Sequence, residues 1–135
     1  MFSIFPLLTI ILIAFNLIAL IAGDGTQTFL STDLFHKTMQ SGAVFSLNPN
    51  EILILVALFL LFFEIFKSTR ASDTSIVEHI LSLFIFLIFL MEFIFWGRLT
   101  CASFLIVGCM SLLDVVAGFT ISITAARRDI GIAKS

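Results

Sequence analysis

Four long apolar runs, separated by short polar segments, organise this chain of 135 residues. The hydrocarbon core of a bilayer is about 30 Å thick, and a helix needs roughly 20 apolar residues to cross it. The second run is apolar without interruption over 52–63, as expected for a helix that contacts lipid and neighbouring helices. The pattern predicts an all-α membrane protein with a single integral membrane domain, 1–135, and four transmembrane helices at about 3–22, 49–68, 76–96 and 101–126.

Capping signals mark the expected ends of these helices. Residues 48–51, Asn-Pro-Asn-Glu, combine an N-cap, a proline at the first helical position and an acid three positions past the cap. Ser75 and Glu78 repeat the capping pattern and start the third helix, and Thr100 is the expected cap of the fourth. The fourth helix exceeds the thickness of the bilayer core, so we expect it to tilt or protrude before Gly131 stops it.

The polar segments between the helices differ in length. Short links at 67–74 and 97–100 make sequential helices antiparallel and predict an up-down bundle. The longer segment, 24–47, contains apolar residues at roughly helical spacing, which favours a short amphipathic helix on the membrane surface. An irregular loop is the alternative. The residues that carry this prediction are Leu30, Leu34, Phe35 and Met39, with Ser31 or Thr32 as the cap and Gly42 as the stop.

The basic residues predict the orientation in the membrane. Lys67, Arg70, Arg127, Arg128 and Lys134 fall on one side of a four-span chain, and only Lys37 and Arg98 fall on the other. Because cytoplasmic segments carry the excess of Lys and Arg, both termini are expected in the cytoplasm. The loop 24–47 then lies outside, and Trp96 lies at the outer interface. We expect a multi-pass protein of the bacterial inner membrane.

Composition supports this class and excludes several others. Apolar residues make up 60% of the chain and charged residues 12%, too few charges for a soluble domain. The first run lacks a basic start and is longer than the apolar part of a signal peptide, which favours a retained span. Cys101 and Cys109 lie about 12 Å apart on one helix, too far for a disulfide. The sequence predicts no metal, no cofactor and no nucleic-acid partner.

Asp114 is the first candidate for chemistry, because it lies near the centre of the fourth helix. A carboxylate at mid-bilayer costs about 2.5–3.5 kcal/mol on insertion scales. Thr9 and Ser82 should lie at the same depth, and either hydroxyl can donate a hydrogen bond to it. Asp114 is then either a protonatable or ligand-binding residue or a polar clamp between helices or subunits. It also shares a stripe of small residues that lets another backbone approach closely: Gly108, Ser111, Gly118 and Ser122.

Two further polar groups are candidates. Glu92 lies near the outer end of the third helix, where Asn16 or Arg98 is the expected partner; an outward-opening ion or proton site is the alternative. The second group lies at the cytoplasmic ends of the helices and predicts an interfacial network of ion pairs. Its members are Glu64, Lys67, Glu78, His79, Arg127 and Arg128. No catalytic residues are predicted, because no known catalytic motif is present.

Two stretches together resemble a family of small four-span bacterial inner-membrane proteins of uncharacterised activity. The first is 63–70, Phe-Glu-Ile-Phe-Lys-Ser-Thr-Arg. The second starts as Asp-Val-Val-Ala-Gly-Phe-Thr over 114–120 and runs on through Ala-Ala-Arg-Arg-Asp at 125–129. The resemblance covers about 50–131 and implies the fold and the location only.

The leading functional interpretation is a non-enzymatic membrane protein, an accessory or scaffold subunit or a self-associating bundle. It would contact the lipid bilayer and other membrane proteins or itself, through Asp114 and the small-residue stripe. The alternative is a small proton-coupled transporter or channel that uses Asp114, with Glu92 and Glu64 marking a path.

Three comparisons weigh against the other functions. Four-span drug exporters carry an essential acid in the first span. The first span of this chain has only the polar residues Thr9 and Asn16. A membrane enzyme is less favoured because the polar groups lie at three depths. A holin-like pore-forming protein is less favoured because the tail, 127–135, is only mildly basic.

Overall fold

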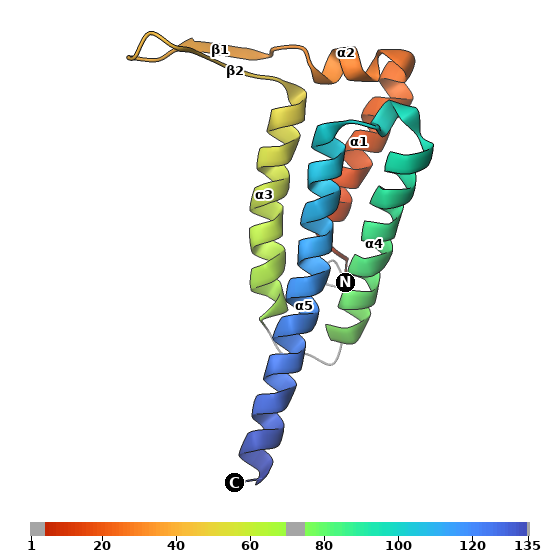
Figure 1. The fold of residues 1–135 in the computed structure, drawn as a ribbon, viewed down its shortest axis with the longest axis vertical. Coiled ribbons are helices and arrows are strands. Elements are labelled where there is room, and N and C mark those ends of the chain that lie inside the picture. The colour runs from red at the N-terminus through yellow and green to blue at the C-terminus, as the bar shows by residue number, and fades with distance from the viewer. Residues whose placement is uncertain (1–4, 70–74, 135) are drawn as a thin grey trace.

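The computed structural model describes residues 5–69 and 75–134, which form long helices and one small sheet (Figure 1). In chain order the elements are α1 Leu8–Ala22, the 3₁₀ turn η1 Gly23–Gly25, α2 Thr26–Leu30, β1 Phe35–Thr38, β2 Val44–Leu47, α3 Pro49–Ser68, α4 Ser75–Phe95, the 3₁₀ turn η2 Gly97–Leu99 and α5 Ala102–Lys134. Figure 1 shows α1, α3, α4 and α5 side by side, with successive long helices running in opposite directions. The two strands project sideways from one end of these helices.

Within the described residues, three helical segments are long and apolar enough to cross a membrane: Leu8–Leu30, Ile76–Phe95 and Ala102–Arg128. The prediction of a helical membrane protein is therefore confirmed at this level. Helix α3 is not among the three, although it spans the predicted 49–68. Its uninterrupted apolar part, 52–63, rises about 18 Å. This rise is smaller than the thickness of a bilayer core, about 30 Å. The apolar part is short because charged residues limit it at both ends.

The start of α3 is the predicted capping box. The Asn48 side chain accepts a hydrogen bond from Glu51 N–H at 3.0 Å, and Glu51 Oε2 accepts one from Asn48 N–H at 3.1 Å. Pro49 occupies the first turn, where its missing N–H costs nothing. The sequence pattern placed both ends of this helix because the cap is formed entirely by residues close in the chain.

Thr100 does not cap α5 as predicted. Its hydroxyl donates to the backbone carbonyls of Phe93 at 2.8 Å and Trp96 at 3.3 Å. The 3₁₀ turn η2 brings Thr100 back beneath the last turn of α4, so the side chain closes the preceding helix and not the following one. Helix α4 begins at Ser75, and the rest of the preceding link, 70–74, including Arg70, lies outside the described residues.

The first and last helices differ from the predicted lengths. Helix α1 begins at Leu8, after Pro6, whose carbonyl accepts the Thr9 N–H at 3.1 Å; the first two residues of the predicted span 3–22 lie outside the described residues. Helix α5 continues to Lys134 and extends past the ends of α3 and α4 (Figure 1). Gly131 does not stop it, because its backbone stays out of the left-handed conformation that ends helices. A glycine inside a helix costs only about 1 kcal/mol relative to alanine.

The predicted amphipathic helix in the loop 24–47 is wrong, and so is the alternative of an irregular loop. Residues 35–47 form an antiparallel hairpin of β1 and β2. Leu30 belongs to the short helix α2 and is buried, Phe35 belongs to β1, and Leu34 and Met39 lie outside both elements, so these apolar residues do not share one helix. Gly42 has a φ of 89°, which glycine adopts without strain, and the Met39 N–H closes the turn onto the Ala43 carbonyl at 2.8 Å.

Aromatic rings from three helices form the centre of the core. The ring centroid of Phe104 in α5 lies 5.1 Å from that of Phe15 in α1 and 5.1 Å from that of Phe89 in α4. Helix α3 adds the buried side chains of Ala57 and Leu61. The outward faces of all four long helices expose large apolar side chains, which suits a surface in contact with lipid.

Candidate functional site

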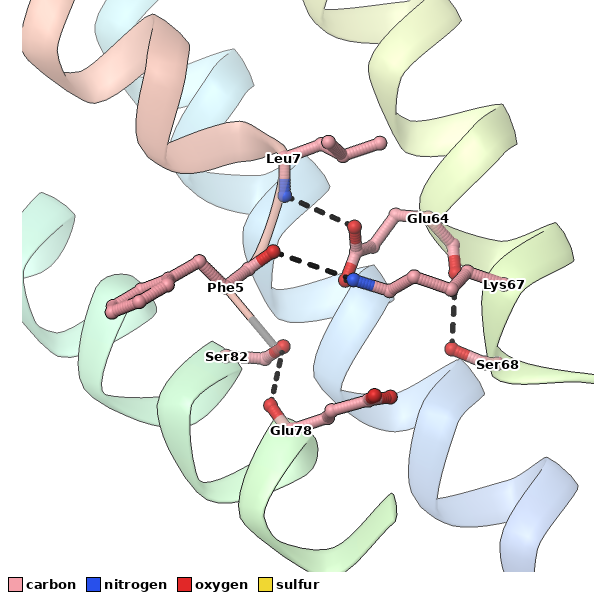
Figure 2. Close-up of polar contacts among 7 residues, drawn as sticks. All are labelled: Phe5, Leu7, Glu64, Lys67, Ser68, Glu78 and Ser82. Atoms are coloured by element: carbon pink, nitrogen blue, oxygen red, sulfur yellow. Dashed lines mark hydrogen bonds and ion pairs between the residues drawn. The ribbon is translucent and has the colours of Figure 1, made fainter. Parts of the chain in front are cut away.

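Glu64 of α3 is the centre of a polar cluster between the helices, and Glu64 is only 3% exposed. Its Oε1 lies 3.2 Å from Lys67 Nζ, and its Oε2 accepts a hydrogen bond from Leu7 N–H at 3.0 Å (Figure 2). Leu7 is the N-cap of α1, so the carboxylate meets a free N–H at the positive end of the helix dipole. The buried charge is therefore compensated by both α3 and α1.

Lys67 extends this contact to the chain that precedes α1. Its ammonium group also donates to the Phe5 carbonyl at 3.3 Å, while the Ser68 hydroxyl donates to the Glu64 carbonyl at 3.1 Å (Figure 2). The Lys67 side chain is partly exposed, so its charge keeps access to a polar phase while its stem lies along the protein. These bonds fix the end of α3 against the start of α1.

His79 of α4 is buried and joins α4 to α5. Its Nε2 lies 2.6 Å from Ser122 Oγ, and the centroid of its ring lies 5.2 Å from that of Phe119. A Cβ added at Gly118 would lie 2.7 Å from two atoms of the imidazole. Gly118 therefore provides the space that the ring occupies.

Asp114 of α5 is buried at 3% exposure, and its Oδ2 has no hydrogen-bond partner among the described residues. The Ser82 hydroxyl of α4 is within hydrogen-bonding reach of its carboxyl group, and Glu64 and Lys67 are within electrostatic range. Ser82 donates its own proton to the Glu78 carbonyl at 3.0 Å (Figure 2). Asp114 therefore lies near polar groups of α3 and α4, while its Oδ2 has no hydrogen-bond partner in the described part of the chain.

Other predicted partners do not join this cluster. Thr9 has a buried hydroxyl oxygen that also lacks a hydrogen bond in the described part of the chain, so Thr9 does not donate to Asp114. Arg127 and Arg128 are exposed on α5, beyond the cluster, and form no ion pair within the described residues. Of the expected network, the described residues show the Glu64–Lys67 ion pair, and Glu78 and Glu64 lie in electrostatic range of His79. Glu78 also has an interaction partner of its own.

A second polar contact lies toward the other end of the helices. Asn16 Nδ2 of α1 donates to Glu92 Oε2 of α4 at 2.9 Å and to its own helix at the Leu12 carbonyl, at 2.8 Å. Of the two partners expected for Glu92, the structure places Asn16 beside it and directs Arg98 elsewhere. The contact joins α1 to α4 at a level different from the Glu64 cluster.

Arg98 has a role that the sequence did not indicate. Its guanidinium group donates to the Ala19 carbonyl at 3.4 Å and lies 3.6 Å from Asp24, and its own carbonyl accepts the Gln27 side-chain amide at 2.8 Å. The Ala19 carbonyl also accepts the Gly23 N–H, so Arg98 adds a second hydrogen bond at the carboxyl end of α1, and its charge matches the negative end of the helix dipole. Only the tertiary arrangement brings these groups together, since 79 residues separate Arg98 from Ala19.

A further contact missed from the sequence joins the beginnings of α3 and α5. Ser103 Oγ lies 2.5 Å from Asn50 Oδ1 and 3.3 Å from Cys101 Sγ. Each of these residues lies next to the start of a helix. Because successive long helices are antiparallel, α3 and α5 start at the same end, and this was the only feature of the sequence that could have predicted the contact.

The small-residue stripe of α5 faces α4 in the same chain. Gly108 lies against Phe89, and Gly118 and Ser122 lie against His79. Ser111 is almost completely buried. Because these positions and Asp114 are covered by the chain itself, they do not form the external contact surface that we expected.

The chemistry available at this site is hydrogen bonding and proton or charge exchange at carboxyl and imidazole groups. The described residues contain no group of three or more His, Cys, Asp or Glu side chains that could hold a metal ion. Comparisons with protein-family models, curated proteins and solved structures found no match to this chain.

Proposed function

We propose that this chain crosses a bacterial inner membrane four times as an antiparallel bundle, with both termini in the cytoplasm. Three segments have the required length and apolar character. The compensated charge of Glu64 supports the inclusion of α3, because an ion pair and an N–H bond lower the cost of its burial. The carboxyl ends of α3 and α5 lie toward the same end of the helices (Figure 1), and Lys67 stands in the last turn of α3 while Arg127 and Arg128 stand in the carboxyl-terminal part of α5, in keeping with the positive-inside rule. The resemblance to four-span proteins at 63–70 and 114–129 is consistent with this arrangement.

Cysteine labelling of intact cells tests the topology. In a variant without the two native cysteines, Ser41→Cys is expected to react with a membrane-impermeant maleimide from outside. Arg128→Cys is expected to react only after the inner membrane is permeabilised. Labelling of both positions from the same side would mean that the number of crossings between them is even, which contradicts the proposal.

We further propose that the protein acts as a non-enzymatic accessory or scaffold subunit of the membrane. The observation that carries this proposal is that the interior polar groups join one helix to another: Glu64 to the start of α1, His79 to α5, and Asn16 to Glu92. Such contacts favour one fixed arrangement of the helices. With Asp114 and the stripe buried, any partner would contact the apolar outer faces.

Chemical crosslinking within cells tests this role. A photo-crosslinking amino acid at Phe59, an exposed position on α3, is expected to give one adduct of defined mass that contains a membrane protein. The same group at the buried position Ala57 serves as the matched control and is expected to give none. A monodisperse single chain in mild detergent, together with no adduct from any outer face, would contradict the proposal.

A second candidate function is a small proton-coupled transporter or channel. The observation that favours it is the Oδ2 of Asp114, which has no hydrogen-bond partner among residues 5–69 and 75–134 and lies near Ser82, Glu64 and Lys67. An ionisable residue inside a membrane protein commonly marks a proton or ion path. Proteoliposomes containing the protein are expected to show a pH-dependent flux that Asp114→Asn abolishes. An equal flux in the variant would exclude this use of Asp114.

A further inference from the structure

The hairpin of β1 and β2 lies apart from the packed helices. It projects sideways across their direction, at the end where α2 and the start of α3 lie (Figure 1). All residues of β1, and the first two of β2, are exposed. A two-stranded hairpin alone is marginally stable in water, so a surface that covers one of its faces would stabilise it.

Its two faces differ in polarity. Side chains alternate across a strand, so directly paired residues share a face. The pairs Phe35 with Leu47 and Lys37 with Phe45 form one face, and their aromatic rings are in contact, with centroids 6.5 Å apart. The opposite face consists of the pairs His36 with Ser46 and Thr38 with Val44. One face is thus mainly apolar with a single lysine, and the other is mainly polar.

The described part of the chain covers the apolar face only in part, and Leu47 is half-buried. Phe35 is 47% exposed and Phe45 is 43% exposed. Fully burying a side chain of this size is worth about 1.5–3 kcal/mol relative to leaving it exposed. The two rings therefore carry enough apolar surface to favour contact with an apolar phase.

The connection between the hairpin and α3 determines where an apolar phase would lie relative to the hairpin. Only Asn48 separates the end of β2 from the first residue of α3, and the apolar part of α3 starts one turn later, at Ile52. If α3 enters the bilayer at that point, the hairpin lies at the level of the lipid headgroups and along the plane of the membrane. A lysine on the same face as the aromatic rings can reach headgroup phosphates while its stem lies on apolar surface.

We propose that this hairpin is an in-plane membrane anchor, with Phe35, Phe45 and Leu47 inserted at the boundary between headgroups and acyl chains of the outer leaflet. The face that carries His36 and Thr38 is in contact with water. The inference rests on the proposed crossing of the membrane by α3. It goes beyond that proposal because it assigns a lipid-binding surface to a segment outside the helices.

Tryptophan fluorescence in liposomes tests the anchor. In a Trp96→Phe background, single tryptophans are placed at neighbouring positions on opposite faces by Phe45→Trp and Val44→Trp. We expect the Phe45→Trp protein to be quenched by lipids brominated near the headgroup and to be severalfold less accessible to acrylamide than the Val44→Trp protein. Phe35→Trp and Thr38→Trp repeat the comparison on the other strand, in case one variant fails to fold.

The outcomes separate the anchor from its alternatives. Equal acrylamide quenching on both faces, without quenching by brominated lipid, would overturn the proposal. Protection of the Phe45→Trp variant from acrylamide without quenching by brominated lipid would also overturn it, in favour of a second copy or another protein on this face. Phe59→Trp on α3 is the reference for membrane crossing, and it is expected to be quenched by deeply brominated chains. If that reference fails, the membrane arrangement itself is wrong.

Discussion

The imidazole of His79 lies directly over the backbone of Gly118, and no larger residue fits at that position of α5. A Cβ there would lie 2.7 Å from the ring. The ring cannot easily move aside, because its Nε2 is bonded to Ser122 and the side chain is buried. The close approach of α4 and α5 at this level therefore depends on the absence of a Cβ atom at Gly118.

Gly118→Ala is expected to destabilise the protein by about 1–3 kcal/mol, because overpacking displaces the ring and its hydrogen bond. Reversible unfolding in mixed detergent and SDS micelles, followed by circular dichroism, measures this loss. Gly108→Ala is the matched control on the same helix, since a Cβ there would meet Phe89 at an ordinary 3.5 Å. Equal losses in the two variants would contradict the assigned contact.

Glu64 offers a second test, because its two oxygens have different partners. Glu64→Leu removes the acceptor for Leu7 N–H and the counter-charge of Lys67, and we expect a loss of about 2–3 kcal/mol. Glu64→Gln keeps an acceptor and is expected to lose about 1 kcal/mol. The same unfolding assay distinguishes them. If the effect of Glu64→Leu is unchanged when Lys67 is replaced by Met, the two side chains do not interact.

Asn16 and Glu92 form a polar pair that joins α1 to α4. Asn16→Leu leaves the Glu92 carboxyl without its donor, and we expect a loss of about 1 kcal/mol, typical of hydrogen bonds between membrane helices. Leu17→Ala, one position along and exposed, keeps an apolar side chain toward the outside and should have little effect on the same contact. A variant at Asn16 with unchanged unfolding would mean that water or lipid replaces the bond at no cost.

Asn48 allows a test of local helix capping. Asn48→Ala removes the acceptor for Glu51 N–H and is expected to cost about 1 kcal/mol. Asn48→Ser keeps a capping oxygen and should retain most of the stability. Hydrogen exchange of the first turn of α3 gives the local readout, and faster exchange confined to that turn is the expected result.

Local signals predicted some elements well and tertiary contacts decided the others. The capping box at Asn48 placed the start of α3 because its hydrogen bonds span only three residues. Matching depths along straight helices brought Asn16 to Glu92, since the rise per residue is constant. The hairpin could not be separated from a helix by spacing alone, because a short segment with a few apolar residues fits both periods.

The polar cluster was only partly predictable. The sequence marks Asp114 as unusual inside an apolar helix and places Glu64 and His79 in a group at the cytoplasmic helix ends, but their partners depend on how the helices rotate and where α1 begins. The backbone N–H of Leu7 and the carbonyl of Ala19 carry no signal in their residue types. A helix end becomes a binding partner only when the fold brings a charged side chain to it.

The contacts of α1 also bear on the order in which the protein can be made. Three long-range hydrogen bonds of α1 and its N-cap pair Leu7 with Glu64, Asn16 with Glu92 and Ala19 with Arg98, across 57, 76 and 79 residues. During synthesis, the first helix therefore enters the membrane before any of these partners exists. Helix α1 can form the first of these hydrogen bonds when α3 has been synthesised, and the other two only when α4 and the turn after it are complete. The helix that is made first is therefore the last to complete its contacts.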